Sequence, residues 1–209
     1  MFPFPPPAEN NLNGTLPEEI GSLESLVVLR VGTNPWLYGS LPSSLSSMSD
    51  LRELTAYRCS FMGQMPQEIG RLTGLTYMAI NENRLSGTVP TSIGQLTLLD
   101  ELYMYNNQLD GTIPLELGNL INLRIVAFQH NQLIGSIPNT LSNLQQLKHV
   151  DFSYNNLNDG ASNLCRIDTL LLYVTDCYSQ SFPTTINKEI LCPCCTLCCS
   201  EQADTCQLN

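Results

Sequence analysis

The sequence of 209 residues is poor in positive charge and contains no long apolar run. Nine lysines and arginines stand against nineteen aspartates and glutamates, for a formal net charge of −10. Nucleic-acid binding requires a basic surface, so this balance argues against a nucleic-acid partner and against adsorption to anionic membranes. No run reaches the roughly 18 apolar residues of a membrane-spanning helix. We therefore expect membrane contact only through a segment absent from this chain.

Motifs of the common enzyme classes are also missing. The sequence has no G-x-S-x-G elbow, no H-E-x-x-H motif, no phosphate loop and no kinase domain. His149, Asp151 and Ser153 alternate along one predicted strand, but residues two apart on a strand are separated by about 6.6 Å and their side chains run parallel. A nucleophile and its base need contact at about 2.6–3.2 Å. We expect no enzymatic activity, no cofactor and no catalytic metal.

Cysteine is almost absent before Cys165, where only Cys59 occurs, and is abundant afterwards. An even number of cysteines crowded into a short stretch predicts disulfides and an oxidising compartment. Their C-x-C and C-x-x-C spacings could also hold zinc, but a disulfide cap fits a cluster that directly follows the end of a repeat array. The candidates are Cys165, Cys177, Cys192, Cys194, Cys195, Cys198, Cys199 and Cys206.

Most of the chain consists of one unit that recurs with a period of about 24 residues, which is typical of a solenoid. Prolines mark the copies at a constant spacing, with one extra residue between the first two. A glycine stands three residues before each proline, and an asparagine, or once Cys59, stands seventeen residues after it. The prolines are Pro17, Pro42, Pro66, Pro90, Pro114 and Pro138, and the asparagines are Asn34, Asn83, Asn107, Asn131 and Asn155.

The clearest copy, residues 99–120, shows what one unit builds. It has seven apolar positions, which no single unit could bury but stacked neighbours bury as one core. Leu102 and Met104 should point inward from a short strand, with Tyr103 and Tyr105 outward. Stacked strands then form a parallel sheet. The asparagine side chain should bond the backbone of the turn that follows the strand.

The pattern L-x-x-L-x-x-L-x-L-x-x-N-x-L-x-G-x-I-P-x-x-L-G-x-L resembles the plant-specific subtype of the leucine-rich repeat family. The resemblance implies an α/β-type solenoid dominated by short parallel strands, curved and right-handed, with the strands on its concave side. Members of that family mostly bind proteins, peptides or glycans. We expect a Pro-rich stub at 1–9, six to seven repeats at 10–164, and a last short repeat with a disulfide-rich cap at 165–209.

The C-terminal residues resemble the ending of leucine-rich repeat proteins that are abundant in diatoms and related algae. Asp176-Cys177 and the C-x-C-C-T-x-C-C run at 192–199 carry this resemblance, and many such proteins resemble cell-surface or secreted receptors. In the last strand, Leu172 and Val174 should point inward. Residues 1–10 have no signal-peptide features and the chain enters the repeat midway, so we expect upstream repeats and a signal or anchor segment in a longer protein.

Outward strand positions should stack into four columns, and tyrosines gather in the middle units. Tyrosine offers a large contact area with a polar tip and is enriched at interfaces, although it is also a good strand former that can simply pack. We predict a ligand-binding patch on the concave face. Its residues are Tyr57, Arg58, Tyr77, Glu82, Glu101, Tyr103, Tyr105, Asn106, Gln129 and His130.

The sequence thus predicts a monomeric recognition module, extracellular or at the cell surface, that binds a protein, peptide or glycan. It would be a receptor ectodomain or a secreted inhibitor of a wall-degrading enzyme. The alternative is a structural, adhesive or ice-binding protein. Ice binding favours a regular threonine ladder, and Thr15, Thr88 and Thr112 share the position after the glycine. Ser40, Gln64 and Ser136 interrupt that ladder.

Three single features carry local expectations. Trp36 lies beside the one-residue insertion and is expected to pack rather than to be exposed. Cys59 replaces a column asparagine, and its neighbours supply no base, so we expect a structural thiol. Asn13-Gly14-Thr15 is the only N-glycosylation sequon, and its use and its chance occurrence are equally good interpretations.

Overall fold

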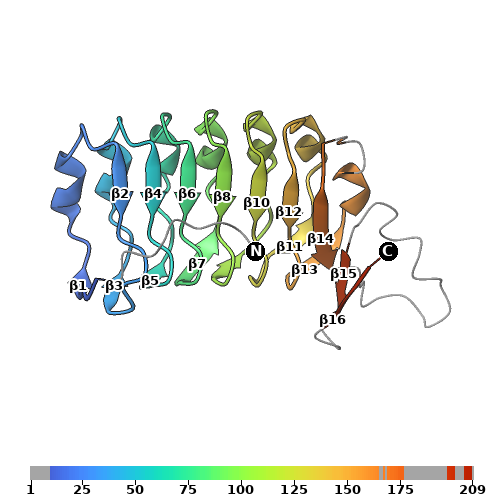
Figure 1. Cartoon of the computed structure of the whole chain (residues 1–209), viewed down its shortest axis with the longest axis horizontal. Coiled ribbons are helices and arrows are strands. Elements are labelled where there is room, and N and C mark those ends of the chain that lie inside the picture. Colours follow the sequence, from blue (N-terminus) through green and yellow to red (C-terminus); the bar gives the residue numbers. More distant parts are fainter. Residues whose placement is uncertain (1–9, 165–166, 168, 177–196, 201–204, 209) are drawn as a thin grey trace.

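The computed structural model describes residues 10–164, 167, 169–176, 197–200 and 205–208, and within them the chain is a curved solenoid of stacked coils (Figure 1). Each coil runs through a short strand on the concave side, a second strand along a flank, and a 3-10 helix on the convex side. The predicted right-handed solenoid of short parallel strands is therefore confirmed. The predicted stub at 1–9 lies outside the described residues.

The concave sheet holds one strand from each coil, and neighbouring strands run parallel. Its register joins Glu53, Tyr77 and Glu101 in one outward column and Leu54, Met78 and Leu102 in one inward column, as the repeat predicts. In order the strands are β2 (Val28–Arg30), β4 (Glu53–Thr55), β6 (Tyr77–Ala79), β8 (Glu101–Tyr103), β10 (Ile125–Ala127), β12 (His149–Asp151) and β14 (Leu172–Asp176).

A flank sheet forms where each coil turns away from the concave side. Every coil contributes a glycine with positive φ at this turn, for example +68° at Gly111, where an added Cβ would lie 2.7 Å from the Thr88 methyl group. The glycine column is thus a backbone requirement. The strands are β1 (Gly14–Thr15), β3 (Leu37–Gly39), β5 (Ser60–Gly63), β7 (Arg84–Thr88) and β9 (Gln108–Asp110), followed by the pair β11 (Ile134–Ser136) and β13 (Asn156–Asp159).

The convex side is built from 3-10 helices, and the described residues contain no α-helix. Pro90 shows how they begin: its backbone is extended, and its carbonyl accepts the Ile93 N–H at 3.0 Å. None of the described helices is long and apolar enough to cross a membrane. The helices are η1 (Glu18–Ser22), η2 (Ser43–Ser47), η3 (Ile69–Arg71), η4 (Thr91–Gln95), η5 (Leu115–Asn119), η6 (Asn139–Asn143) and η7 (Ala161–Leu164).

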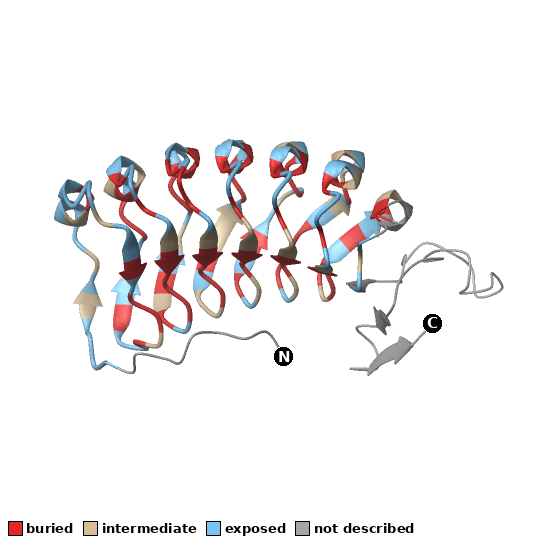
Figure 2. Cartoon of the chain, turned by 45° about the horizontal axis from the view of Figure 1, so that its top comes forward, coloured by how far each residue is buried: buried red, intermediate tan, exposed pale blue. Residues whose placement is uncertain are grey.

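One apolar core runs between these layers through all the described coils. Buried residues occur in each concave strand from β2 to β12 and in the turn after it (Figure 2). Leu102, Met104, Leu109 and Leu117 are all fully buried, as the apolar positions of the repeat predict. Because each coil buries its apolar side against the next coil, stability depends on the interfaces between coils.

The column asparagines tie these coils together through buried hydrogen bonds. The Asn107 Nδ2 donates to the Met104 carbonyl at 3.1 Å and to the Ile80 carbonyl of the preceding coil at 3.0 Å. Its Oδ1 accepts the Leu85 N–H at 3.0 Å. Asn83, Asn131 and Asn155 repeat the arrangement. The amide thus pairs backbone groups that the turn leaves without partners.

The single break in this column, Cys59, is linked to the single insertion. In the coil with the insertion, the Leu37 N–H donates to the Asn34 carbonyl of its own coil at 2.9 Å. In other coils the N–H at the same position donates instead to the side chain of the column asparagine in the next coil, as Leu85 does to Asn107. Residue 59 therefore requires no acceptor, and the thiol donates to the Val31 carbonyl at 3.3 Å. Burial raises the pKa of the Cys59 thiol, so the structure gives it a packing role and no activating base.

Trp36 contradicts the expectation that it packs, because 69% of its surface is exposed. The inserted residue precedes β3, where Leu37 turns inward and is buried while Trp36 and Tyr38 point outward. Alternation along the strand therefore places the indole on the outer face of the flank sheet.

The last strand also differs from the prediction. Tyr173 lies opposite Val150 in the inward column, and Leu172 lies opposite His149. The register of β14 is therefore shifted by one residue from the one that the expected inward positions of Leu172 and Val174 require. Three consecutive leucines precede Tyr173, so the apolar pattern does not fix the register there.

Two further strands, β15 (Leu197–Ser200) and β16 (Thr205–Leu208), extend the concave sheet beyond β14. They pair antiparallel with Cys199 opposite Cys206, and such pairing brings Cα atoms within disulfide range. Disulfide bonding of the C-terminal cysteines stays a prediction. Cys165, Cys177, Cys192, Cys194 and Cys195 lie outside the described residues.

The Asn107→Ala variant should lose about 3 kcal/mol of unfolding free energy, because two carbonyls and one N–H become unpaired inside the protein. The Cys59→Ala variant should lose only about 1 kcal/mol, because a single weak thiol donor is removed. Urea unfolding followed by circular dichroism measures both. Equal losses at the two positions would contradict the link between the insertion and Cys59.

Candidate ligand-binding face

The ten residues of the predicted patch lie on one surface, along the outward side of the concave sheet and the turns that follow its strands. The rings of Tyr77 and Tyr103, in neighbouring coils, have centroids 5.7 Å apart. The Arg58 guanidinium contacts the Glu82 carboxylate at 2.8 Å, one coil further along. The structure therefore brings the patch residues together, and their role in binding stays a prediction.

Two of the tyrosines form the floor of this surface. Tyr57 is 5% exposed and Tyr103 is 1% exposed, and with Ala79 and Ala127 they make a small apolar cluster separate from the main core. Tyr103 stands between these alanines in one outward column, where the small neighbours leave room for its ring. The interpretation that tyrosines pack therefore applies to Tyr57 and Tyr103, while Tyr77 and Tyr105 are partly exposed above them.

The tyrosine hydroxyls and the carboxylates of the face form one polar layer. Tyr103 donates to Glu101 at 2.7 Å, and Tyr105 donates to Glu82 at 3.3 Å. Burial raises the pKa of Tyr57, Tyr77, Tyr103 and Tyr105 above the usual tyrosine value. These hydroxyls remain protonated donors at any physiological pH.

Three arginines balance the acidic side chains of this face. Arg30 binds Glu53 through two hydrogen bonds at 2.5 and 2.6 Å, and Arg124 pairs with Asp100. Such exposed pairs contribute little to stability, but they hold the side chains in place. The concave face is consequently polar with paired charges, although the whole chain is acidic.

A rim of left-handed residues follows the strands, and no pattern in the sequence indicated it. One residue per coil, just before the column asparagine, has φ between 52° and 57°. This conformation is uncommon for residues other than glycine, and the turn requires it in every coil. The side chains leave the rim in fixed directions: the His130 and Tyr154 rings stack at 4.1 Å. The residues are Thr33, Arg58, Glu82, Asn106, His130 and Tyr154.

Three buried polar atoms of this face have no hydrogen-bond partner among the described residues: Tyr77 Oη, Asn81 Oδ1 and Gln129 Oε1. Buried polar groups are nearly always paired, so unpaired ones call for an explanation. Asn81 was not predicted as a site residue. It is fully buried between Tyr57 and Tyr105 in the same outward column, and a polar residue between two tyrosines was the signal that could have identified it.

The contact between Ser153 and Asp151 corrects one expectation. The Ser153 hydroxyl donates to the Asp151 carboxylate at 2.6 Å, and the Ser153 N–H donates to the same oxygen at 3.0 Å. Ser153 lies past the end of β12, where the chain turns, so strand spacing does not separate the two side chains. The contact closes a turn. The described residues hold no cluster of three or more His, Cys, Asp or Glu side chains suited to a metal ion.

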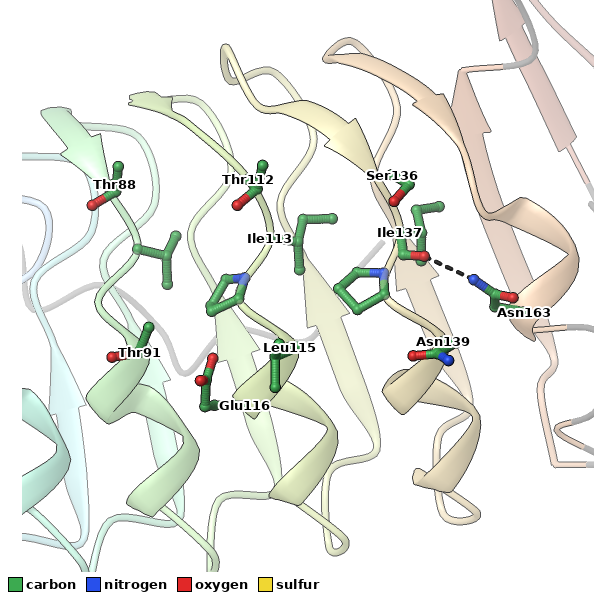
Figure 3. A pocket seen from close by; sticks show the side chains of 13 residues that line it. Thr88, Thr91, Thr112, Ile113, Leu115, Glu116, Ser136, Ile137, Asn139 and Asn163 are labelled. Carbon is green, nitrogen blue, oxygen red and sulfur yellow. Dashed lines mark hydrogen bonds between the residues drawn. The ribbon is translucent and has the colours of Figure 1, made fainter.

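A hollow of about 720 Å³ lies away from the concave face, between the flank sheet and the convex helices (Figure 3). Thr88, Thr112 and Ser136 place one side chain per coil along it, and Glu116 and Asn139 line its other side. The Asn163 amide donates to the Ile137 carbonyl at 2.8 Å at its end. This hollow contains Thr88 and Thr112 of the threonine column together with Ser136, which interrupts it.

Comparison with known proteins agrees with this architecture. Residues 98–120 and 122–144 match the family model described as Leucine Rich Repeat. No curated protein matches the chain. The ectodomain of the Arabidopsis receptor kinase HAESA, in complex with an N-terminally extended IDA peptide hormone, superimposes with a TM-score of 0.74 at 27% identity. That match covers 80% of this chain and 32% of the receptor chain.

Two further solved structures are similar. HAESA in complex with IDA and the co-receptor SERK1 has a TM-score of 0.71 at 30% identity, covering 79% of this chain and 27% of that chain. A plant ice-binding protein has a TM-score of 0.71 at 32% identity, covering 79% and 53%. The chain thus spans between about a quarter and about half of the length of these solved proteins, and two of its repeats match the leucine-rich repeat model.

The Asp151→Asn variant should be more stable than the unmodified protein at neutral pH. Burial raises the pKa of Asp151, against the opposing effects of hydrogen bonds from Ser153 and the charge of His130. Above the unfolded value of about 3.9, the folded state then holds more protons than the unfolded state, so stability falls as pH rises. Asparagine keeps an oxygen that accepts the hydrogen bonds from Ser153 and has no charge to bury, so the loss of stability at higher pH disappears.

Thermal melts between pH 3.5 and 7.5 measure the effect. The gain from Asp151→Asn should be present at pH 7 and vanish below about pH 4, where the aspartate is itself protonated. Asp110→Asn, at an exposed position in β9, is the control and should give little gain. A gain that is independent of pH would contradict the assigned cause.

Proposed function

We propose that this chain is an extracellular or cell-surface recognition module that binds a protein, peptide or glycan on its concave face. An extended peptide is the ligand that this geometry favours. The HAESA structures, whose leucine-rich repeat ectodomain is in complex with a peptide hormone, support the proposal by similarity of fold. The module acts as a monomer that binds and does not catalyse.

The observation that carries the proposal is the set of unpaired polar atoms on one face. Tyr77 Oη and Asn81 Oδ1 lie in one coil and Gln129 Oε1 lies two coils further along, on the floor of the same surface. An extended peptide presents backbone N–H and C=O groups at regular intervals. Small rotations of the partly exposed Tyr77 and Gln129 side chains would let them pair with the peptide backbone.

The shape of the face suits the same ligand. Seven repeat strands about 4.8 Å apart give a surface roughly 30 Å long, enough for about nine extended residues. The tyrosine floor supplies apolar contact area, and the left-handed rim supplies side chains held in fixed directions, Asn106 and His130 among them. Rigid side chains lose little entropy on binding, which favours affinity.

Selection from a random peptide display library tests the proposal. Enriched peptides should bind the Tyr105→Ala/His130→Asn variant about tenfold more weakly, because a partly exposed aromatic anchor and a rim side chain are lost together. Asparagine at position 130 tolerates the left-handed backbone, so the fold is kept. Tyr103 is unsuitable for this test because it is buried.

The control variant is Leu115→Ser/Ile121→Ser, which removes two exposed apolar side chains from the convex side. Peptide affinity should be unchanged in this variant. If the enriched peptides lose affinity equally in both variants, or if none is enriched at all, the concave face is not the peptide site.

Ice binding is the second candidate, favoured by the similar plant ice-binding protein and by the hydroxyl column of the flank hollow. Consecutive coils carry threonine in this column only at Thr88 and Thr112, since Gln64 precedes them and Ser136 follows. We therefore rank it below peptide recognition. The recognition proposal predicts no inhibition of ice recrystallisation. Inhibition by the unmodified protein that is lost in Thr112→Lys would establish the alternative instead.

A further inference from the structure

Trp36 is the only tryptophan of the chain, and it lies in an exposed aromatic patch on the outer face of the flank sheet. Tyr38, two residues further along the chain in β3, is 51% exposed. The Ser60 hydroxyl donates to the Pro35 carbonyl at 2.9 Å and fixes the inserted segment that carries the indole. Contiguous apolar groups held in this way on a surface usually contact something.

The sequon asparagine, Asn13, lies at the same patch. The Gly14 N–H donates to the Trp36 carbonyl at 3.1 Å, and β1 pairs with β3 so that Gly14 is opposite Leu37. If this parallel register is continued by one residue toward the N-terminus, Asn13 lies opposite Trp36. Both residues, with Tyr38 and Ser60, line a groove of about 600 Å³. Asn13 itself is exposed.

We propose that Asn13 carries an N-linked glycan whose first N-acetylglucosamine stacks on Trp36 in this groove. One face of a β-linked pyranose ring presents C–H groups, and an indole presents the electron-rich face that attracts them. The hydroxyl and acetamido groups at the ring edge stay in water, beside the polar ends of Tyr38 and Ser60. The sugar thus covers apolar surface without burying an unpaired polar group.

The modification needs one co-reactant, a lipid-pyrophosphate-linked oligosaccharide of the secretory pathway. The Asn13 amide nitrogen attacks the anomeric carbon, forming the C–N bond and losing one proton. The bond between that carbon and the pyrophosphate oxygen breaks, and the lipid pyrophosphate leaves with the bonding electrons. This step occurs in nature only if the protein is secreted or displayed at the cell surface, as the proposed function states. The stacking of the sugar on Trp36 depends only on the groove.

The experiment uses the full chain, fused to a secretion leader and expressed in a eukaryotic host that adds high-mannose glycans. Intact mass reports occupancy of Asn13. One portion is trimmed with an endoglycosidase that leaves a single N-acetylglucosamine, and Asn13→Gln provides the sugar-free protein. Because Trp36 is the only tryptophan, its fluorescence and its quenching by acrylamide report on this groove alone.

The trimmed protein should show a blue-shifted Trp36 emission and weaker quenching than Asn13→Gln. The single sugar should also raise Tm by about 2–4 °C. In Trp36→Ala, which keeps the sequon and removes an exposed side chain, the same sugar should leave Tm unchanged. That variant is the matched control for a general effect of glycosylation.

Three results would overturn the proposal: an unmodified mass, an occupied Asn13 with unchanged Trp36 quenching, or a Trp36 already protected in Asn13→Gln. The last result would assign the groove to another occupant, such as a second copy of the chain. Peptide selection is carried out separately on Asn13→Gln, whose concave face is intact, so failure of the glycan proposal and failure of peptide recognition are distinguished.

Discussion

The buried amide of the column asparagines is the interaction on which the rest of the structure depends. Each amide joins backbone groups of its own coil and of the coil before it, as Asn107 does with Met104 and Ile80. These bonds fix the distance and register between coils. Equivalent residues then lie one above another, and side chains one repeat apart in sequence become neighbours. Where the asparagine is replaced, at Cys59, an inserted residue upstream removes the need for its acceptor.

The concave face follows from that register. Tyr103 fits between Ala79 and Ala127 because the three share a column, so the outward side of the sheet acquires a small apolar cluster of its own. This cluster serves stability and leaves a flat aromatic floor. Beside this cluster lie the buried, unpaired Asn81 Oδ1 and the rim side chain of His130. Tyr57 and Tyr103 thus serve packing, while Tyr77 and Tyr105 are partly exposed, where the proposed ligand would contact them.

The constant repeat period was sufficient to predict most of the fold, because it assigns each residue to a column. The inward positions of Leu102 and Met104, the outward neighbours of Tyr77 and the turn role of the asparagines all follow from it. The predictions were wrong where the period is interrupted. The insertion turned Trp36 outward, and the leucine run before Tyr173 hid the register of the last strand. The repeat pattern predicts which side chains share a column but not how far each one is buried. The burial of Tyr57, the left-handed rim and the unpaired Asn81 were therefore visible only in the three-dimensional structure.

Hydrogen exchange of individual backbone amides tests the central interaction most directly. The N–H groups of Leu85, Leu109 and Leu133 each donate to an asparagine side chain of the next coil, outside the regular pairing of the concave sheet. They should exchange as slowly as the Val126 amide at the centre of β10. Exchange of these three amides at the rate of exposed turn residues would show that the asparagines do not hold the coils together.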